Sequence, residues 1–313
     1  MLRFLINRLI STLPVLGVVA IIVFAMLRIA PGDPVAVIAG EGASAQDMAL
    51  MREALGLDRP LPVQFMAWLG QIASGDLGYS FFYKMKVTDL IAQRLEPTLS
   101  VAAVTLVLTV LVSVPLGMLA SWRRGSTLDR AIMTLSVSGL SIPVFVAGYV
   151  LIWVFAMQLG WFPSQGYGSF SQGIAPWLRH LALPCITLAI LYCALIARTT
   201  RAAVSEALTE DYIRTARAKG ISEMRLMFRH ALANAAVPIV TVIGLSLAGL
   251  IGGVVVTETI YAIPGLGQLT VDAVLSRDYP LIQGITLFFS LLYVAVNLLV
   301  DLSYLALDPR IRY

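Results

Sequence analysis

The chain has 313 residues, of which 58% are hydrophobic and 13% charged, and its formal net charge is +4. Soluble globular domains carry about 25% charged residues, so this composition excludes an ordinary soluble protein. The basic residues cluster in short loops between apolar segments, a pattern typical of membrane orientation and not of nucleic-acid binding.

The chain starts with Arg3 and Arg8 before a long apolar run, which resembles a signal peptide. This run covers residues 9–29. It is longer than the roughly 7–15 residues of a signal-peptide core and has no clear small-x-small cleavage site. We therefore expect an uncleaved first membrane helix.

Six apolar segments are long enough to cross a bilayer. A hydrocarbon core requires about 20 apolar residues of helix. The backbone inside it must satisfy its own hydrogen bonds, which favours helices, and the alternation typical of a β-barrel is absent. We predict an all-α membrane protein with spans over residues 9–29, 98–121, 131–157, 181–197, 236–257 and 281–307.

Basic residues predict the orientation of these spans. If both termini lie on the same side of the membrane, that side carries more Lys and Arg residues than the other side, and its loops are shorter. Arg123, Arg124, Arg214 and Arg217 are examples of these basic residues. The positive-inside rule then makes both termini cytoplasmic. The predicted parts are a cytoplasmic N-terminus with the first span (1–30), an extracytoplasmic helical region (31–96), a transmembrane core (97–307) that includes the inner loop 198–235, and a cytoplasmic tail (308–313).

Residues 31–96 form the one sizeable outer loop. Ser44 with Asp47 resembles a helix N-cap signal, and Gly56 is placed to end that helix. A second amphipathic helix is predicted over residues 62–73, before the breaker Gly-Asp-Leu-Gly at 75–78. The region is too short for a large core, so we expect it to pack on the membrane bundle. It is either a structural connector or a docking surface or outer gate, and both interpretations stay open.

The inner loop over residues 198–235 is polar and basic. Residues 206–219 favour a helix, which Gly220 ends, and Ser222 resembles the N-cap of a second short helix over 225–232. We predict a helix–turn–helix at the membrane surface. It is either an interfacial amphipathic loop or a docking element for a soluble partner.

Nothing in the chain indicates catalysis or ATP binding. None of the three lysines, Lys84, Lys86 and Lys219, follows a glycine, so the phosphate-binding loop G-x-x-x-x-G-K-[ST] is absent. The motifs H-E-x-x-H and G-x-S-x-G are absent too. Cys185 and Cys193 share one apolar segment and fit no disulfide or metal-ligand spacing, so we interpret them as buried small side chains.

The stretch Tyr-Ile-Arg-Thr-Ala-Arg-Ala-Lys-Gly at 212–220 resembles the inner-loop signature of ATP-binding-cassette (ABC) importer permeases, in the form found in the dipeptide, oligopeptide, glutathione and nickel branch. The general signature, Glu-Ala-Ala-x3-Gly-x9-Ile-x-Leu-Pro, is degenerate here. With its Gly on Gly220, Arg214, Thr215 and Ala216 take the Glu-Ala-Ala positions. Other segments resemble the same branch over nearly the whole chain: residues 31–34, 75–78, 257–260, 264–267, 277–280, 297–302 and 308–312.

This resemblance implies a type I ABC importer-like transmembrane domain with a small helical extracytoplasmic insertion, in a bacterial or archaeal inner membrane. The chain would be the first, B/C-type permease of an importer of di-/oligopeptides or glutathione-like solutes. The implied partners are a second homologous permease, two ATP-binding subunits and an extracytoplasmic solute-binding protein, and no nucleic acid. No cofactor is expected in this chain, since ATP and Mg would bind to the partner ATPase subunits.

Three groups of residues carry the expected function. The ATPase-coupling group is Glu206, Asp211, Tyr212, Arg214, Thr215, Ala216, Arg217, Lys219, Gly220, His230 and Asn234. The outer-gate or pathway candidates are Glu258, Pro264, Gly265 and Gly267. The alternative interpretation is that this stretch is an ordinary loop turn. The binding-protein docking candidates are Asp33, Asp76 and Gly78. No catalytic or metal-binding residue is expected.

Three alternatives remain. A permease of the same type for nickel or another small solute is the first, although no His/Cys/Met cluster supports a metal path. A secondary transporter or channel is the second, and the lack of midplane charge and of inverted repeats argues against it. An intramembrane enzyme is the third, and it lacks a convergent set of catalytic side chains.

Overall fold

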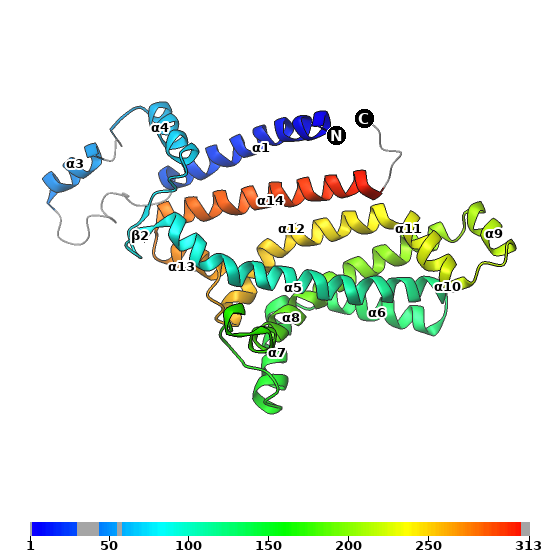
Figure 1. Cartoon of the computed structure of the whole chain (residues 1–313). Coiled ribbons are helices and arrows are strands. Elements are labelled where there is room, and N and C mark those ends of the chain that lie inside the picture. The colour runs from blue at the N-terminus through cyan, green and yellow to red at the C-terminus, as the bar shows by residue number, and fades with distance from the viewer. Residues whose placement is uncertain (1, 30–43, 55–57, 308–313) are drawn as a thin grey trace. The chain divides into compact units, whose positions relative to one another are not determined.

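The structure, a computed structural model, describes residues 2–29, 44–54 and 58–307 (Figure 1). Within these ranges the regular secondary structure is helical apart from one short hairpin. The elements are α1 (Leu2–Ile29), α3 (Ala45–Ala54), α4 (Leu61–Ala73), β1 (Tyr79–Ser80), β2 (Met85–Lys86), α5 (Val87–Trp122), α6 (Thr127–Ser141), α7 (Val144–Leu151), the π-helix η1 (Ile152–Gln158), the 3₁₀-helix η2 (Phe170–Gln172), α8 (Ile174–Ala207), α9 (Asp211–Ala218), α10 (Glu223–Arg225), the π-helix η3 (Leu226–Ala231), α11 (Leu232–Asn234), α12 (Ala236–Ile260), α13 (Leu266–Leu275) and α14 (Tyr279–Leu307).

Several of these helices are long and apolar enough to cross a membrane. In the described part of the chain, α5, α8, α12 and α14 pass a test of length and composition, and α6 with α7 and η1 makes a fifth if that bent pair is one span. The apolar stretch of α1, Ile10–Met26, is shorter. The prediction of a multi-pass helical membrane protein is confirmed, whereas the count of six spans stays a prediction.

The third predicted span, over residues 131–157, is not one straight helix. It is bent by 102° between α6 and α7. The cause is Pro143, which has no N–H to donate and pushes the residue before it out of the helical region. Ile142 accordingly has an extended backbone, with φ −86° and ψ 121°.

The chain forms two compact units. The first comprises Met1–Glu96 and Leu269–Val294, and the second comprises Pro97–Gln268 and Ala295–Tyr313. In the first unit, Phe24 of α1 contacts Phe65 and Trp68 of α4, with ring centroids 5.1 and 5.6 Å apart. Helix α4 therefore packs on the apolar helix α1, which agrees with the expectation that residues 31–96 are too few for a core of their own.

The hairpin of the first unit is held by Asp278, a buried acid at the start of α14. Its carboxylate accepts hydrogen bonds from the Ser80 hydroxyl (2.5 Å), the Phe82 N–H (3.2 Å) and the Leu281 N–H (3.3 Å). The Gln283 side chain of α14 also donates to the Val23 carbonyl of α1 (2.9 Å). One carboxylate thus caps α14 and fixes β1 and β2 to it.

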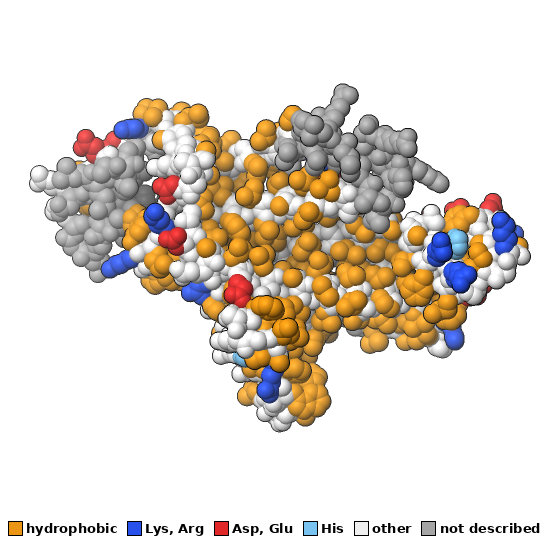
Figure 2. Space-filling model, viewed as in Figure 1, with side chains coloured by type: hydrophobic (Ala, Val, Ile, Leu, Met, Phe, Trp, Pro, Cys, Tyr) orange, Lys and Arg blue, Asp and Glu red, His pale blue; other side chains and the backbone are white. Residues whose placement is uncertain are grey.

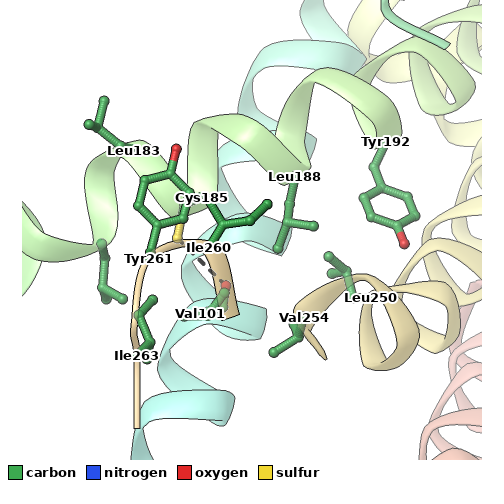
Figure 3. Close-up of a cluster of buried hydrophobic side chains, with 11 residues drawn as sticks. Val101, Leu183, Cys185, Leu188, Tyr192, Leu250, Val254, Ile260, Tyr261 and Ile263 are labelled. Atoms are coloured by element: carbon green, nitrogen blue, oxygen red, sulfur yellow. Dashed lines mark hydrogen bonds between the residues drawn. The ribbon is translucent and has the colours of Figure 1, made fainter. Parts of the chain in front are cut away.

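The second unit is organised around α8, of which 61% of the most apolar 18-residue stretch is buried, against 17–33% in the other full-length spans. Its core lies between α5, α8, α12 and the loop that follows α12 (Figure 3). The buried members are Val101, Leu181, Leu183, Cys185, Leu188, Tyr192, Leu250, Val254, Ile260, Tyr261 and Ile263. The prediction that Cys185 is a buried apolar side chain is confirmed, and Cys193 is partly buried.

Helices α5 and α8 run parallel in a constant register. Three contacts join residues 84 positions apart: the Cys185 thiol with the Val101 carbonyl (3.7 Å), the Cys193 thiol with the Thr109 carbonyl (3.7 Å), and the Ser121 and Ser205 hydroxyls (3.0 Å). A Cβ at Gly117 would lie 2.6 Å from the Ala197 carbonyl oxygen and from Thr200 Cβ. The two backbones are close here because residue 117 has no side chain.

An ion pair joins α6 to α8. The Arg201 guanidinium donates to both oxygens of Asp129, at 2.5 and 2.7 Å, and the Asp129 side chain is only 4% exposed. Asp129 also accepts from the Gly125 N–H (2.9 Å), while the Ser126 hydroxyl caps α6. This bidentate geometry gives a stronger carboxylate–guanidinium ion pair than a single hydrogen bond would.

Removing one partner of this pair leaves a charge without its counter-ion. We expect Asp129→Asn to destabilise the second unit by about 2 kcal/mol, since hydrogen bonds to charged groups contribute about 1.5–3 kcal/mol. The measurement is thermal unfolding of the purified protein in detergent. The matched control is Asp211→Asn, because the Asp211–Arg214 pair (3.4 Å) is exposed and such pairs contribute about 0–1 kcal/mol. Equal effects of the two substitutions would contradict a structural role for Asp129.

Candidate functional site

The inner loop folds as a short helix fixed to the ends of the spans. The buried side of α9 carries Ile213 and Ala216, which are 0% and 7% exposed. They belong to a second hydrophobic cluster, which we call the loop core: Met118, Val204, Ala207, Ile213, Ala216, Leu226, Met227, Ala231, Ala235 and Ile239. These residues come from α5, α8, α9, η3 and α12, so α9 packs against the ends of three long helices at once.

Gly220 ends α9 as predicted, but the helix predicted over residues 206–219 is interrupted, since α8 ends at Ala207 and α9 begins at Asp211. The φ of Gly220, +79°, lies in the left-handed region that favours glycine. The Gly220 N–H donates to the Arg217 carbonyl (3.0 Å) and the Ile221 N–H to the Ala216 carbonyl (3.3 Å). This pair of bonds is the Schellman motif, which satisfies the last carbonyls of a helix and reverses the chain.

Ser222 occupies the N-cap position of α10, although its side chain makes no capping hydrogen bond. The predicted second helix over 225–232 begins two residues earlier and is partly a π-helix, since it is built from α10, η3 and α11. The Arg217 guanidinium donates to the Glu223 carboxylate at 2.7 and 3.2 Å. These bonds lower the pKa of Glu223, and they hold the corner between α9 and α10.

The outward side of α9 and η3 combines aromatic and basic side chains. Tyr212, Met224 and Phe228 are large hydrophobic residues that are 38%, 60% and 56% exposed. Exposed basic residues lie among them: Arg214, Arg217, Lys219, Arg225 and Arg229. Figure 2 shows the Lys and Arg side chains gathered with a histidine over this region. We call this surface the loop face.

Most of the predicted coupling residues lie on the loop face or beside it. Exposed members are Glu206, Asp211, Tyr212, Arg214, Thr215, Arg217, Lys219, Gly220 and Asn234, and His230 is partly buried. Asn234 donates to the His230 carbonyl (2.7 Å). Ala216 differs from the rest, because it points into the loop core and is not available to a partner. Its small size allows α9 to pack on its own chain.

The predicted outer-gate residues converge on one buried carboxylate. Glu258, in the last turn of α12, is 0% exposed. Its Oε1 accepts from the Thr98 hydroxyl (2.6 Å), and its Oε2 accepts from the N–H groups of Gly267 (2.7 Å) and Gln268 (3.0 Å). Gly265 and Gly267 are buried beside it, and Pro264 is partly buried in the connecting loop. Thr98 is the member of this cluster that the sequence patterns do not indicate.

Of the predicted docking residues, Asp33 lies outside the described residues. Asp76 is exposed, and its Oδ1 accepts from the Gly78 N–H (2.9 Å). The Gly78 carbonyl in turn accepts from the Val87 N–H (3.0 Å). Asp76 and Gly78 therefore form the turn that leads into β1, and their role toward a partner stays a prediction. Among the residues that the structure describes, no group of three or more His, Cys, Asp or Glu is placed to hold a metal ion.

Comparisons with known proteins agree with this architecture. Residues 113–313 match the family described as "Binding-protein-dependent transport system inner membrane component", and residues 1–102 match the corresponding N-terminal family. The chain is 54% identical over 310 residues to the "Probable peptide ABC transporter permease protein y4tP" of Sinorhizobium fredii, covering 99% of each chain. It is 43% identical to the "Glutathione transport system permease protein GsiC" of Escherichia coli K12, over 313 residues and 100% of each chain.

A solved structure shares the fold. The MetNI methionine ABC transporter in inward-facing conformations matches with a TM-score of 0.60 and 19% identity, covering 71% of this chain and 97% of that chain. The family match over residues 113–313 covers well over half of the chain, and two relatives align over 99–100% of it. The chain therefore belongs to the family of binding-protein-dependent transport system inner membrane components, the multi-pass permeases of ABC importers.

Proposed function

We propose that this chain is the permease subunit of an ATP-driven importer of di-/oligopeptides or glutathione-like solutes. It lines the pathway together with a second homologous permease, while two separate ATPase subunits bind ATP and Mg and an extracytoplasmic binding protein delivers the solute. The observation that carries this proposal is α9, a short amphipathic helix with one side packed on the loop core and the other side free to bind a soluble partner.

The topology in this proposal has six spans with both termini in the cytoplasm. It counts α1 as the first span and α6 with α7 as one broken span. The chain's positive-inside pattern supports this orientation. The loop face then lies on the cytoplasmic side, where ATP is available.

The packing of α9 explains how a partner could move the spans. Ile213 and Ala216 contact a cluster that includes Met118 of α5, Val204 of α8 and Ile239 of α12. Protein interiors are close-packed and transmit displacements with little compression. A rigid-body movement of α9 would therefore reach three long helices together.

The loop face indicates the kind of surface that the ATPase presents. Aromatic residues and arginine are the side chains most often found at the energetic centre of protein interfaces. Tyr212 and Phe228 supply apolar area, and Arg214 and Arg225 supply positive charge. We expect an apolar cleft with an acidic rim on the ATPase subunit.

The solute class rests on the relatives. Their printed names refer to peptide and glutathione transport, at 54% and 43% identity over essentially the full length. The test is uptake by the complete complex, with its binding protein, in ATP-loaded liposomes. We expect labelled dipeptides, oligopeptides or glutathione to accumulate and nickel ions not to. ATP-dependent nickel uptake, or solute movement by this chain alone without ATP, would replace the proposal by one of the alternatives.

Docking can be tested at an exposed position of α9. We expect Arg214→Glu to weaken co-purification of the ATPase subunits about 10-fold or more, since a reversed charge at an interface costs at least 1.4 kcal/mol, a factor of ten in affinity. The control is Arg130→Glu, an exposed basic residue on α6 outside the loop face. Normal docking of Arg214→Glu would contradict the assignment of the loop face. A charge at Ala216 is a poor test, because it would disrupt the loop core.

The chain reversal at Gly220 provides a second test. We expect Gly220→Pro to abolish ATP-driven uptake, because proline fixes φ near −65° and removes the N–H that donates to Arg217. Gly220→Asn should retain most uptake, since Asn tolerates the left-handed region. Uptake and thermal unfolding are measured on both variants. Equal loss of uptake in the two variants would contradict the claim that uptake depends on the left-handed chain reversal at residue 220.

The corner between α9 and α10 should depend on pH. The folded-state pKa of Glu223 is lowered by Arg217, so the ion pair stabilises the corner fully above the unfolded pKa of about 4.3 and is lost as the pH falls through the folded value. We expect hydrogen-exchange protection of α9, corrected for intrinsic rates, to be constant above about pH 5 and to fall as the pH drops from there through the folded pKa of Glu223 in the wild type. Glu223→Gln should show low protection throughout that range. An identical profile in both proteins would contradict this prediction.

A further inference from the structure

We propose that Thr98 is a positioning residue of the importer, and that with Glu258 it forms a latch at the end of α12 remote from α9. The latch comprises the Thr98 hydroxyl, the Glu258 carboxylate and the backbone N–H groups of residues 266–268. The inference rests on the proposed import function, in which the outer end of the pathway must close whenever the inner end opens.

The position of the latch follows from the length of α12. This helix begins at Ala236, next to the loop core, and ends at Ile260, so its 25 residues separate the two regions by about 37 Å. Figure 1 shows α9, α10 and α11 gathered where α12 begins. With α9 in the cytoplasm, the latch lies at the outer end of the pathway.

Thr98 is the centre of the hydrogen-bond geometry. Its hydroxyl donates to Glu258 Oε1 (2.6 Å) and accepts from the Leu266 N–H (2.8 Å). The hydroxyl therefore joins the end of α12 and the start of α13 to α5. Both Thr98 and Glu258 are buried, at 4% and 0% exposure, so water does not compete for these bonds.

The two glycines make room for this arrangement. A Cβ at Gly265 would collide with the Glu258 carboxylate, and one at Gly267 would lie 2.5 Å from Val255 Cα. Any side chain at either position would push the first N–H groups of α13 away from the carboxylate. Gly265 and Gly267 thus allow the N-terminus of α13 to lie against the buried Glu258 carboxylate, an arrangement that the helix dipole favours.

A second anchor holds the same loop to the rest of the second unit. The Tyr261 hydroxyl lies 2.8 Å from the Thr187 hydroxyl of α8 and donates to the Gly148 carbonyl of α7 (3.3 Å). Figure 3 shows Tyr261 among the apolar side chains of the core. Loss of the Thr98 hydroxyl would remove the hydrogen bonds of Glu258 and Leu266 to α5, while Tyr261 keeps the loop on α7 and α8. The latch is therefore a directional polar contact between α5 and residues 258–268, beside an apolar core.

The polar character of the latch suits a contact that opens and closes. Hydrogen bonds are directional and weaken steeply with displacement, whereas apolar packing does not depend on orientation in this way. A small displacement of residues 266–268 relative to Thr98 would therefore break the latch before the apolar contacts around Tyr261 are lost.

The first experiment measures coupling in the reconstituted complex with its binding protein. We expect Thr98→Val, which keeps the shape and removes the hydroxyl, to lower the amount of solute imported per ATP hydrolysed at least fivefold. Thr98→Ser should restore the ratio to within twofold of the wild type. Ser246→Ala is the matched control, because it removes a buried hydroxyl of α12 that donates to the Val242 carbonyl of its own helix (2.8 Å), and its ratio should be unchanged. A wild-type ratio in Thr98→Val, or a loss in Thr98→Ser as large as in Thr98→Val, would overturn the proposal.

The second experiment separates the latch from the proposed function. Gln268→Cys introduces a thiol beside the latch and keeps the backbone N–H. We expect Thr98→Val to raise the rate at which an impermeant maleimide labels this thiol in membranes at least fivefold. Unchanged labelling would overturn the latch whether or not the complex imports peptides. Faster labelling in a complex that shows no ATP-driven uptake would support the latch and contradict the import function alone.

Discussion

The close parallel packing of α5 and α8 is the constraint on which the second unit depends. The register of 84 residues extends from Val101 with Cys185 to Ser121 with Ser205, and Gly117 lets the backbones approach. Because the hydrocarbon offers no partners for polar groups and little driving force between apolar helices, such close contact is the main source of association there. The two helices then supply fixed platforms at both ends: α8 leads into α9, and α5 carries Thr98.

The two ends differ in how they are held together. At the loop core, α9 is fixed by close-packed apolar side chains such as Ile213 and Leu226, whose attraction does not depend on bond direction. At the far end of α12, the loop is fixed by hydrogen bonds to Thr98 and Glu258. A displacement that enters at α9 would be carried through the long helices as a unit. This displacement would weaken the directional hydrogen bonds of Thr98 and Glu258 more than the apolar contacts. The energetic cost of a conformational change would therefore be concentrated at those hydrogen bonds.

Local patterns predict much of this structure. Apolar length alone predicts α5, α8, α12 and α14, and the glycine after a good helix former predicts the end of α9 at Gly220. The bend at Pro143 was missed because an apolar run with one proline is compatible with both a kinked and a continuous span. The burial of Ala216 was missed because the resemblance to a partner-binding signature outweighed its helical spacing from Ile213. Thr98 and Glu258 are 160 residues apart, and no local pattern links a threonine in one apolar segment to an acid in another.

The burial of Ala216 has a consequence for how transporters of this kind diverge. Ala216 and Gly220 are constrained by the permease's own packing and backbone geometry, so a change of ATPase places no new demand on them. Tyr212 and Arg214 are exposed, and in the proposed complex they would have to suit the surface of the ATPase. As related importers acquire different ATPases, positions 216 and 220 should keep their residues, while positions 212 and 214 should change together with the ATPase cleft.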